Sequence, residues 1–181
     1  MTLLRIFQHA RKVAVNREAV AAERLAHEEA HKKGTHPMSR EDNKALIRYL
    51  FDEVWNKGNL AAAEEVASPT WVAHGNLPGQ EMPGLQGVRR FISIYRTAFP
   101  DMQLIIDDQV AEGDKVVTRW RASATHSGPL MGIAPTGKRV TVSGIGIHRI
   151  ARGQIVEQWG IDDTLGLMQQ LGIVPPLGTQ R

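Results

Sequence analysis

The sequence predicts one α+β domain in which helices are followed by a curved, mostly antiparallel sheet, preceded by an N-terminal helical extension. Three observations lead to this prediction. Apolar residues recur at helical spacing as far as residue 98, their period changes to two after residue 101, and a Gly- and Pro-containing stretch at 34–37 interrupts the pattern early. Helices that precede hairpin-connected strands are typical of α+β domains, so we expect the sheet to wrap the helices around a cavity.

The extension and its linker, residues 1–38, form the first predicted unit. Its helical period is formed by Leu3, Phe7, Ala10 and Ala14. The net charge of +3 lies entirely in this unit, since residues 39–181 carry fifteen groups of each sign. We expect a solvated helix or one packed on a neighbouring subunit; a basic amphipathic helix in which residues 1–33 contact a membrane is the alternative. The neutral body argues against nucleic-acid binding.

Three helices are predicted at the start of the second unit, residues 39–181. The first begins at Ser39, a favoured N-cap with Asp42 three residues later, and ends before Gly58. An alanine-rich helix at 60–67 and a helix at 86–98 follow, ended by Ser68-Pro69 and by Phe99-Pro100.

Four strands come next, each rich in Val, Ile, Thr or Trp. They are predicted over 102–111, 114–126, 138–150 and 154–162. Short connections at 112–114 and 151–153 indicate hairpins, whereas the loop 127–137 is too rich in Gly and Pro for regular structure.

The last hairpin predicts a cavity floor. With a two-residue turn at Arg152-Gly153, Val142 faces Asp163 across the hairpin. Alternation then places one set of residues on a single face: Val142, Gly144, Gly146, His148, Glu157, Trp159 and Asp163. The glycines leave space on that face, and a slip of one residue would move Asp163 to the opposite one.

Asp163 is the first candidate for catalysis. It follows Trp159 by four residues where a strand gives way to a helix, and an aromatic surface beside a carboxylate suits an apolar substrate with an acidic C–H. An N-cap for the helix that begins near Thr164 is the alternative role. Asp162 is the rival carboxylate; alternation turns it to the other face, as a solvent-exposed strand end.

Other side chains are candidates to assist this base. His148 and His126 are candidate hydrogen-bond donors to an enolate, although His148 could instead pair with Glu157 across the hairpin. His74, Trp120 and Trp159 are candidate substrate-binding residues, with a structural histidine as the alternative for His74.

Several classes of site and location are excluded or disfavoured. The chain contains no cysteine, which excludes disulfides, thiolate catalysis and zinc–cysteine sites and fits a cytoplasmic protein. No His and acid pair has metal-ligand spacing, so no metal is expected. No apolar run approaches a membrane span, and charges interrupt the start too early for a signal peptide.

The ordered motifs over roughly residues 40–174 resemble a known family. They are Trp71-Val72-Ala73-His74, Pro83-Gly84-Leu85-Gln86-Gly87, Phe99-Pro100-Asp101, Thr125-His126-Ser127-Gly128, Pro135-Thr136-Gly137-Lys138 and Trp159…Asp163…Leu171-Gly172. This set is similar to the SnoaL-like polyketide and ester cyclases of the nuclear-transport-factor-2-like (NTF2-like) superfamily.

The resemblance implies a cone-shaped α+β fold around one apolar pocket. It also implies an intramolecular aldol condensation without metal or cofactor, in which an aspartate is general base and acid. Asp163 matches that aspartate. We therefore expect a cyclase, or a related isomerase or lyase, acting on a hydrophobic carbonyl compound, and a homo-oligomer (dimer or tetramer). A non-catalytic small-molecule-binding or assembly module is the alternative, since this fold supports both.

Overall fold

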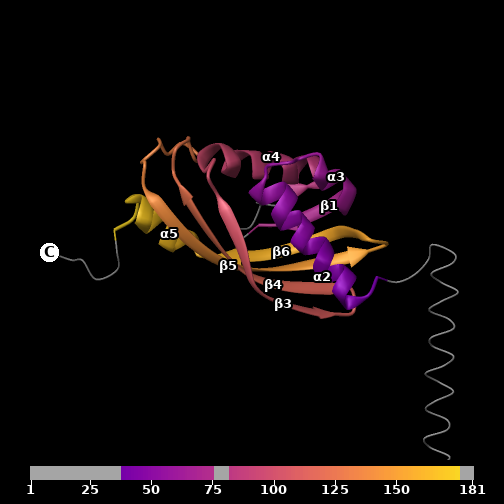
Figure 1. Cartoon of the computed structure of the whole chain (residues 1–181). Coiled ribbons are helices and arrows are strands. Elements are labelled where there is room, and N and C mark those ends of the chain that lie inside the picture. Colours follow the sequence, from indigo (N-terminus) through magenta and orange to yellow (C-terminus); the bar gives the residue numbers. More distant parts are fainter. Residues whose placement is uncertain (1–37, 76–81, 176–181) are drawn as a thin grey trace, which may run out of the picture. The chain divides into compact units, whose positions relative to one another are not determined.

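The computed structural model describes residues 38–75 and 82–175 (Figure 1). The chain divides into two units, residues 1–37 and residues 38–181. The helical extension predicted over residues 1–38 lies outside the described residues, apart from Met38.

The helices of the second unit begin with α2, Arg40–Tyr49. Ser39 caps it as predicted, because its Oγ accepts a hydrogen bond from the Asp42 amide at 3.1 Å while the Asp42 carboxylate accepts one from the Ser39 amide at 3.0 Å. A π-helical segment, η1, continues α2 over Leu50–Asn56. Two further helices complete the layer, α3 at Ala62–Val66 and α4 at Gly84–Ala98.

Six strands form one sheet in the order β2-β1-β6-β5-β4-β3. They are β1 Ala67–His74, β2 Met82–Pro83, β3 Gln103–Glu112, β4 Lys115–Thr125, β5 Arg139–Ala151 and β6 Gln154–Asp162. A last helix, α5, spans Thr164–Leu171. The α+β prediction and the four predicted strands are confirmed, with strand ends shifted by no more than one residue.

Two strands were not among the four predicted. The chain enters β1 at Ala67, just where the sequence predicts the end of the second helix, and β1 pairs in parallel with β6 and antiparallel with β2. The parallel pairing joins residues more than eighty positions apart in the sequence, so no local sequence pattern predicts it.

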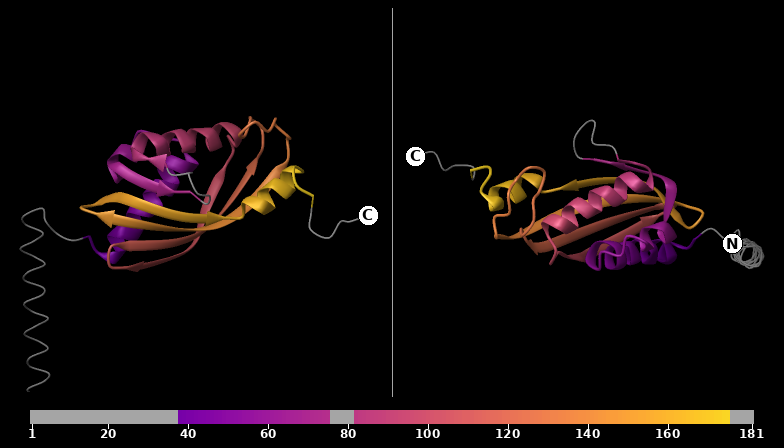
Figure 2. Two further views of the ribbon diagram at one scale, coloured as in Figure 1. Left: turned by 180° about the vertical axis from the view of Figure 1, so that it is seen from behind. Right: turned by 90° about the horizontal axis from the view of Figure 1, so that it is seen from above.

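Within the described residues, helices cover one face of the sheet, which we call the inner face. No described helix covers the opposite, outer face. Figures 1 and 2 show α2, α3 and α4 on the same side of the curved sheet, with α4 lying across it. Burial alternates accordingly: in β4, Val116 and Thr118 are fully buried while Val117 and Arg119 are exposed. Side chains that share a face with Val116 and Thr118 therefore belong to the inner face.

The core between sheet and helices consists of two clusters. One surrounds Ile47, Trp71 and Ile92, and the other lies around Phe99, Leu130 and Leu167, toward α5. Trp55 packs against both clusters, so the junction between them lies under the middle of the helical layer.

The predicted register of the last hairpin is wrong by one residue beyond its turn. The turn is the two-residue Arg152-Gly153, with both φ angles positive, and Ile150 pairs with Ile155 as expected. A β-bulge at Val156 then shifts the register, so that Gly144 pairs with Asp162. Asp162, and not Asp163, therefore occupies the inner face.

Candidate functional site

Asp162 lies at the end of β6 opposite a glycine-lined part of the inner face. It pairs with Gly144, and two positions earlier on each strand Gly160 pairs with Gly146. Gly144 and Gly146 are the two glycines predicted for the cavity floor, and here the neighbouring rings of Trp120 and His148 lie against them. The Asp162 carboxylate is half-buried and accepts a hydrogen bond from Thr164 Oγ1 at 2.6 Å.

The Trp120 indole lies directly over Gly144. A Cβ added to Gly144 would come within 2.4 Å of Trp120 Cζ2 and 2.9 Å of the Ile161 carbonyl oxygen. Trp120 pairs with Gly144 across β4 and β5 and packs against the first core cluster while remaining partly exposed. It therefore presents an aromatic edge on the inner face near Asp162, and its substrate-binding role stays a prediction.

A row of aromatic side chains on α4 lies near the same carboxylate. Phe91, Tyr95 and Phe99 follow one another at i, i+4 spacing, with ring centroids 4.7 and 6.4 Å apart, and Trp55 meets Phe91 edge-on at 6.2 Å. Burial, and secondly the negative charge of Asp162, raise the pKa of Tyr95. A tyrosine phenol is protonated at neutral pH even at its ordinary pKa, so the Tyr95 hydroxyl is a hydrogen-bond donor there.

We call the set Tyr95, Trp120, Gly144, Gly160 and Asp162 the inner-face site. Tyr95 packs against the second core cluster and Trp120 against the first, so the site lies where the two clusters meet. It combines one carboxylate, one protonated phenol and partly exposed aromatic surface. These groups can abstract a proton and stabilise an enolate of an apolar molecule.

Asp163 has the capping role that the sequence offered as its alternative. Its Oδ1 accepts a hydrogen bond from the Gly166 amide at 2.8 Å, and its own amide donates to the Ser143 carbonyl oxygen at 3.0 Å. The residue is exposed at the first turn of α5. This bond satisfies a backbone N–H of the first helical turn that has no partner within the helix, so Asp163 contributes to the start of α5. Its catalytic role stays a prediction.

His148 lies on the inner face but is almost fully buried. Its register partner is Gln158, with which its side chain hydrogen-bonds, and not Glu157 as predicted. Burial lowers the pKa of His148 to about 4, so the ring is neutral at pH 7. Its Nδ1 has no hydrogen-bond partner among the described residues, and Gln109 Oε1 beside Thr118 has none either. A neutral imidazole with one free nitrogen remains able to meet a polar ligand atom.

His126 lies far from His148. It follows β4 by one residue, whereas Val116 near the start of β4 is the partner of His148; ten residues of strand separate them, about 30 Å. His126 is fully buried, its Nδ1 accepts from the Thr136 amide at 3.2 Å, and its ring packs on Phe99. The two histidines are therefore not donors to one shared atom.

His74 and Trp159 lie on the outer face. They are register partners, their rings stack at 5.3 Å with an interplanar angle of 10°, and Trp159 pairs with Ile147. His74 Nε2 also contacts Glu157 Oε1 at 3.0 Å. The bulge in β6 turns Trp159 away from the side that holds Trp120, so the three residues do not line one cavity.

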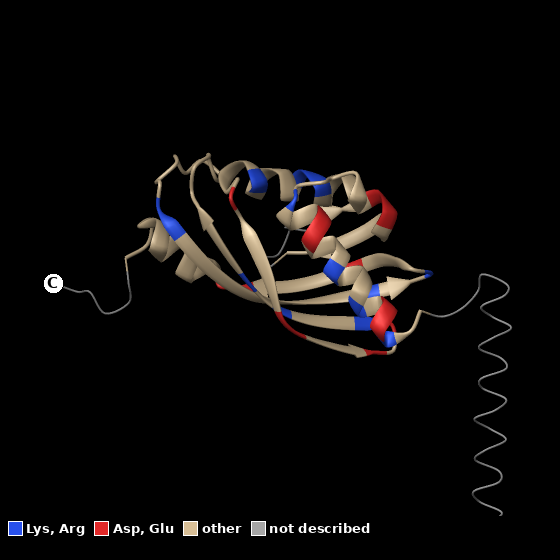
Figure 3. Ribbon diagram, viewed as in Figure 1, with Lys and Arg blue, Asp and Glu red and all other residues tan. Residues whose placement is uncertain are grey.

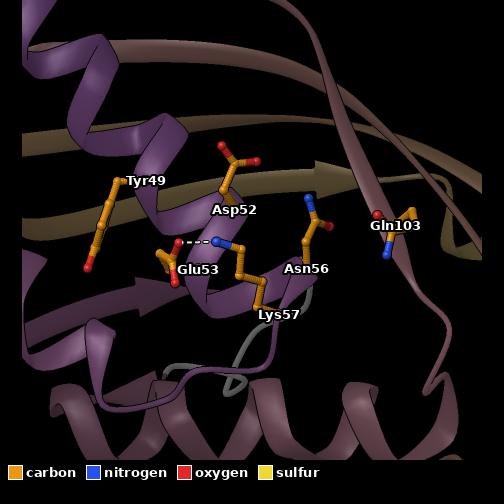
Figure 4. Close-up of a pocket in the computed structure, with 6 residues that line it drawn as sticks. All are labelled: Tyr49, Asp52, Glu53, Asn56, Lys57 and Gln103. Carbon is orange, nitrogen blue, oxygen red and sulfur yellow. Dashed lines mark hydrogen bonds and ion pairs between the residues drawn. The ribbon is translucent and has the colours of Figure 1, made fainter.

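A shallow pocket of about 400 Å³ opens elsewhere, beside η1 (Figure 4). It is lined by Tyr49, Asp52, Glu53, Asn56, Lys57 and Gln103. Glu53 and Lys57 form an ion pair with each other, and Asn56 bonds the backbone of Leu104 in both directions at 2.7 and 3.0 Å. Asn56 thus ties η1 to β3, whereas the Glu53–Lys57 pair joins neighbouring turns of η1, and none of the predicted site residues lines this pocket.

The described part of the chain contains neither a metal-binding cluster nor a membrane-spanning helix. Within residues 38–75 and 82–175, no three His, Asp or Glu side chains gather in a way that could hold a metal ion. In the same residues, the helices are too short or too polar to traverse a bilayer.

Asp162 was predicted on the wrong face of the sheet, and Tyr95 was not among the predicted site residues. The i, i+4 series of Phe91, Tyr95 and Phe99 is visible in the sequence and could have singled out Tyr95. The bulge at Val156 leaves no comparable signal, since Val and Glu are both ordinary strand residues at such a position.

Solved structures with the same architecture come from several bacteria. AclR from Streptomyces galilaeus, a candidate hydroxylase, is 30% identical with a TM-score of 0.69, covering 78% of this chain and 87% of its own. IdmH from Streptomyces antibioticus, a candidate polyketide cyclase, is 32% identical with a TM-score of 0.61, covering 72% and 98%. A SnoaL-like polyketide cyclase candidate from Jannaschia sp. CCS1 is 26% identical with a TM-score of 0.69, covering 78% and 99%.

None of the curated proteins compared matches this chain. The family model for SnoaL-like polyketide cyclases matches residues 45–171, which includes the second half of α2, the other helices and all six strands. The resemblance seen in the sequence motifs is thus confirmed over most of the second unit, and the chain belongs to the SnoaL-like polyketide cyclase family of the NTF2-like superfamily.

Proposed function

We propose that the protein closes a ring in a hydrophobic, polyketide- or ester-like carbonyl compound, and that Asp162 is its general base and acid. The observation that carries this proposal is the β6 register, which puts Asp162 on the inner face beside Trp120 and the glycines. Asp163, the base expected from the sequence, is the alternative. We place the reaction in the cytoplasm, in keeping with a chain that has no cysteine.

The proposed reaction is an intramolecular aldol condensation. The Asp162 carboxylate takes a proton from the carbon between two carbonyl groups, and the resulting enolate carbon attacks a ketone carbon of the same molecule. A carbon–carbon bond forms, the ketone oxygen becomes an alkoxide, and protonated Asp162 returns the proton to it. Nothing is oxidised or reduced, so acid–base groups suffice.

Tyr95 and the aromatic surface support this chemistry. The Tyr95 hydroxyl, protonated at neutral pH and close enough to Asp162 for that charge to raise its pKa, is proposed to donate a hydrogen bond to the enolate oxygen as charge develops. Trp120, Phe91 and Trp55 are partly exposed around the site and offer flat apolar contacts to a folded polyketide chain. His148, about 13 Å along β5 from Gly144, is placed to meet a polar atom at the far end of a long substrate.

Paired variants separate the two aspartates. Asp162→Asn and Asp163→Asn each replace a carboxylate by an amide of the same shape, and Asn is itself a good N-cap, so the second change keeps α5 capped. The probe is a linear aryl β-keto ester with a pendant ketone in D₂O. Proton NMR follows exchange at the acidic carbon, and mass-resolved chromatography follows the cyclised product.

Asp162→Asn is expected to lower the exchange and cyclisation rates by about 10²–10⁴-fold, whereas Asp163→Asn retains most of the wild-type rate. If only Asp163→Asn lost the exchange and cyclisation activity, Asp163 and not Asp162 would be the base. If the probe quenched tryptophan fluorescence saturably but the wild type catalysed no exchange, the protein would be a small-molecule-binding module and not an enzyme. Melting temperatures of both variants control for folding.

A further inference from the structure

Buried polar atoms without a hydrogen-bond partner gather beside the inner-face site. Five such side-chain atoms occur among the described residues, and four of them lie in the region of the first core cluster. These four are Asn43 Oδ1, Trp71 Nε1, Gln109 Oε1 and His148 Nδ1. A buried polar atom that gives up water and gains no other partner destabilises the fold, so four in one region indicate a group that pairs with them when it binds.

The strand register brings two of these atoms to one row of the sheet. The row runs across β3, β4, β5 and β6 and consists of Gln109, Thr118, Gly146 and Gly160. Gln109 Nε2 donates to Thr118 Oγ1 at 3.2 Å. From the next row the His148 ring leans over Gly146, and its Nδ1 lies 3.9 Å from where a Cβ of Gly146 would be. Because Thr118 is the partner of Gly146, its Cβ is only about 5 Å from that point.

Two other elements bring the remaining unpaired atoms to the same region. Asn43 is 3% exposed on the buried face of α2, which packs on β3 and β4. Trp71 is 1% exposed on β1, two residues before Ala73. Ala73 pairs with Gln158 on β6, and Gln158 pairs with His148 on β5. We call the following residues the polar cluster: Asn43, Trp71, Gln109, Thr118 and His148.

The polar cluster adjoins the inner-face site through Gly160, which belongs to that site. A Cβ added to Gly160 would have no atom closer than 3.9 Å, so the inner face has room there. The row that contains Gly160 and Gly146 follows the row of Asp162 and Gly144 by two residues, about 7 Å. A small molecule held at Asp162 therefore needs to extend by only one ring to reach the polar cluster.

Most of the unpaired atoms require a hydrogen-bond donor from the ligand. The amide oxygens of Asn43 and Gln109 can only accept. His148 Nε2 hydrogen-bonds with the Gln158 side chain, a bond that favours the protonated ring, so Nε2 carries the hydrogen and Gln158 accepts. Burial lowers the pKa of His148 to about 4, and the Nδ1 of the neutral ring is consequently an acceptor as well. A ketone oxygen, which cannot donate, would pair with none of these three atoms.

The donor that fits the polar cluster is neutral. An ammonium group also donates, but none of the five residues of the polar cluster is charged at neutral pH, and a buried charge without an opposite one is unfavourable. The charged residues of β5 are Arg139 and Arg149, near its ends, and the stretch between them carries no charge (Figure 3). A hydroxyl group donates one hydrogen bond and can accept others, which also suits the Trp71 indole N–H and the Thr118 hydroxyl.

We propose that the polar cluster binds a hydroxyl group at the far end of the substrate and thereby selects an alcohol over a ketone at that position. This inference rests on the proposed function, because it assigns the end of the substrate that lies away from Asp162. The alcohol hydrogen is donated to His148 Nδ1 or Gln109 Oε1, while its oxygen accepts from the other side of the cluster. A substrate without this hydroxyl leaves the buried acceptors unpaired and is rejected for that reason.

Three probes that differ in one group test this selection on the full chain. They are methyl aroylacetates whose aromatic ring carries a hydroxymethyl, a methyl or a formyl group in the para position, away from the acidic carbon. Quenching of tryptophan fluorescence gives the dissociation constant of each probe without requiring turnover. The hydroxymethyl probe is expected to bind at least about 100-fold more tightly than the other two. Equal affinities, as expected if water molecules alone fill the polar cluster, would overturn the proposal.

A variant of the polar cluster distinguishes a ligand-binding role from a structural one. Gln109→Met replaces the amide by an apolar chain of the same length, so it removes an unpaired buried acceptor. The free variant should melt at or above the wild-type temperature, while the preference for the hydroxymethyl over the methyl probe should fall at least about 10-fold. Gln103→Met makes the same change at an exposed position of the same strand and should alter neither quantity.

The results separate this inference from the proposed reaction. It is overturned if Gln109→Met keeps the wild-type preference for the hydroxymethyl probe, or if this variant melts well below the wild type, because the amide would then serve the fold. Ring closure by the wild type without a preference for the alcohol would contradict the hydroxyl site alone. A preference for the alcohol without ring closure or exchange would contradict the proposed reaction and leave the hydroxyl site in place.

Discussion

Replacing Gly144 by alanine tests whether Trp120 lies against the bare strand of the inner-face site. The added Cβ would be 2.4 Å from Trp120 Cζ2 and 2.8 Å from Cε2, where carbon atoms normally keep about 3.5–4.0 Å apart. The indole must therefore retreat by about 1 Å or more. The Ile161 carbonyl oxygen, 2.9 Å from the new carbon, belongs to the backbone of β6 and limits the strand's own adjustment.

The expected cost follows from overpacking of a rigid ring. Inserting one carbon into a packed site typically costs 1–3 kcal/mol, and two close contacts place Gly144→Ala in the upper part of that range, about 2–3 kcal/mol. Gly160→Ala is the matched control, because it adds the same carbon to the same face with its nearest neighbour 3.9 Å away. That change should be neutral or stabilise by about 0.4–1 kcal/mol through the unfolded chain.

Urea unfolding monitored by circular dichroism measures both free energies of unfolding. Combining Gly144→Ala with Trp120→Phe removes the clashing ring atoms, so the double variant should be less destabilised than the sum of the single ones. Equal stabilities for Gly144→Ala and Gly160→Ala would refute the reasoning. So would strict additivity in the Trp120 cycle, because either result means that the indole does not rest on Gly144.

Two further predictions concern buried and capping groups. The pKa of His148 falls from 6.5 to about 4 on folding. Between these pH values the imidazole is therefore protonated in the unfolded chain but neutral in the folded one. Lowering the pH from 6.5 to 4 should therefore remove about 3 kcal/mol of stability through this group, and His148→Asn should flatten the curve of unfolding free energy against pH by that amount. Asp163→Ala should lower the free energy of unfolding in urea by about 0.5–2 kcal/mol, because it removes the cap of α5. Asp163→Asn should have a free energy of unfolding within a few tenths of a kcal/mol of the wild type. An Asp163→Ala variant as stable as the wild type would contradict the capping role.

Local chemistry accounts for the parts of the fold that could be predicted. The Ser39–Asp42 capping box and the Arg152-Gly153 turn are formed by neighbouring residues, so their signals are present in short stretches. Alternation of apolar residues placed four strands to within one residue. The motif order pointed to the family, which the match over residues 45–171 confirms.

The candidate site could be predicted only in part. Gly144 and Gly146 were predicted on one face of the sheet, and the uninterrupted pairing of β4 with β5 from Lys115 to Thr125 puts Trp120 on that same face. His74 and Trp159 were assigned to the same cavity but stack on the outer face. The predicted faces of Trp159 and Asp163 were both wrong for one reason, since both depended on the register of β6.

The sequence by itself determined the order of the helices and of the four strands β3 to β6, the family, and the presence of a carboxylate pair at the end of β6. Only the tertiary structure decided which carboxylate faces inward. A strand alternates faces at every residue, so the single extra residue at Val156 exchanges the roles of Asp162 and Asp163. Whether a bulge forms depends on how β6 fits between β5 and the distant β1, and that competition between two partners is not encoded in any local stretch of the chain.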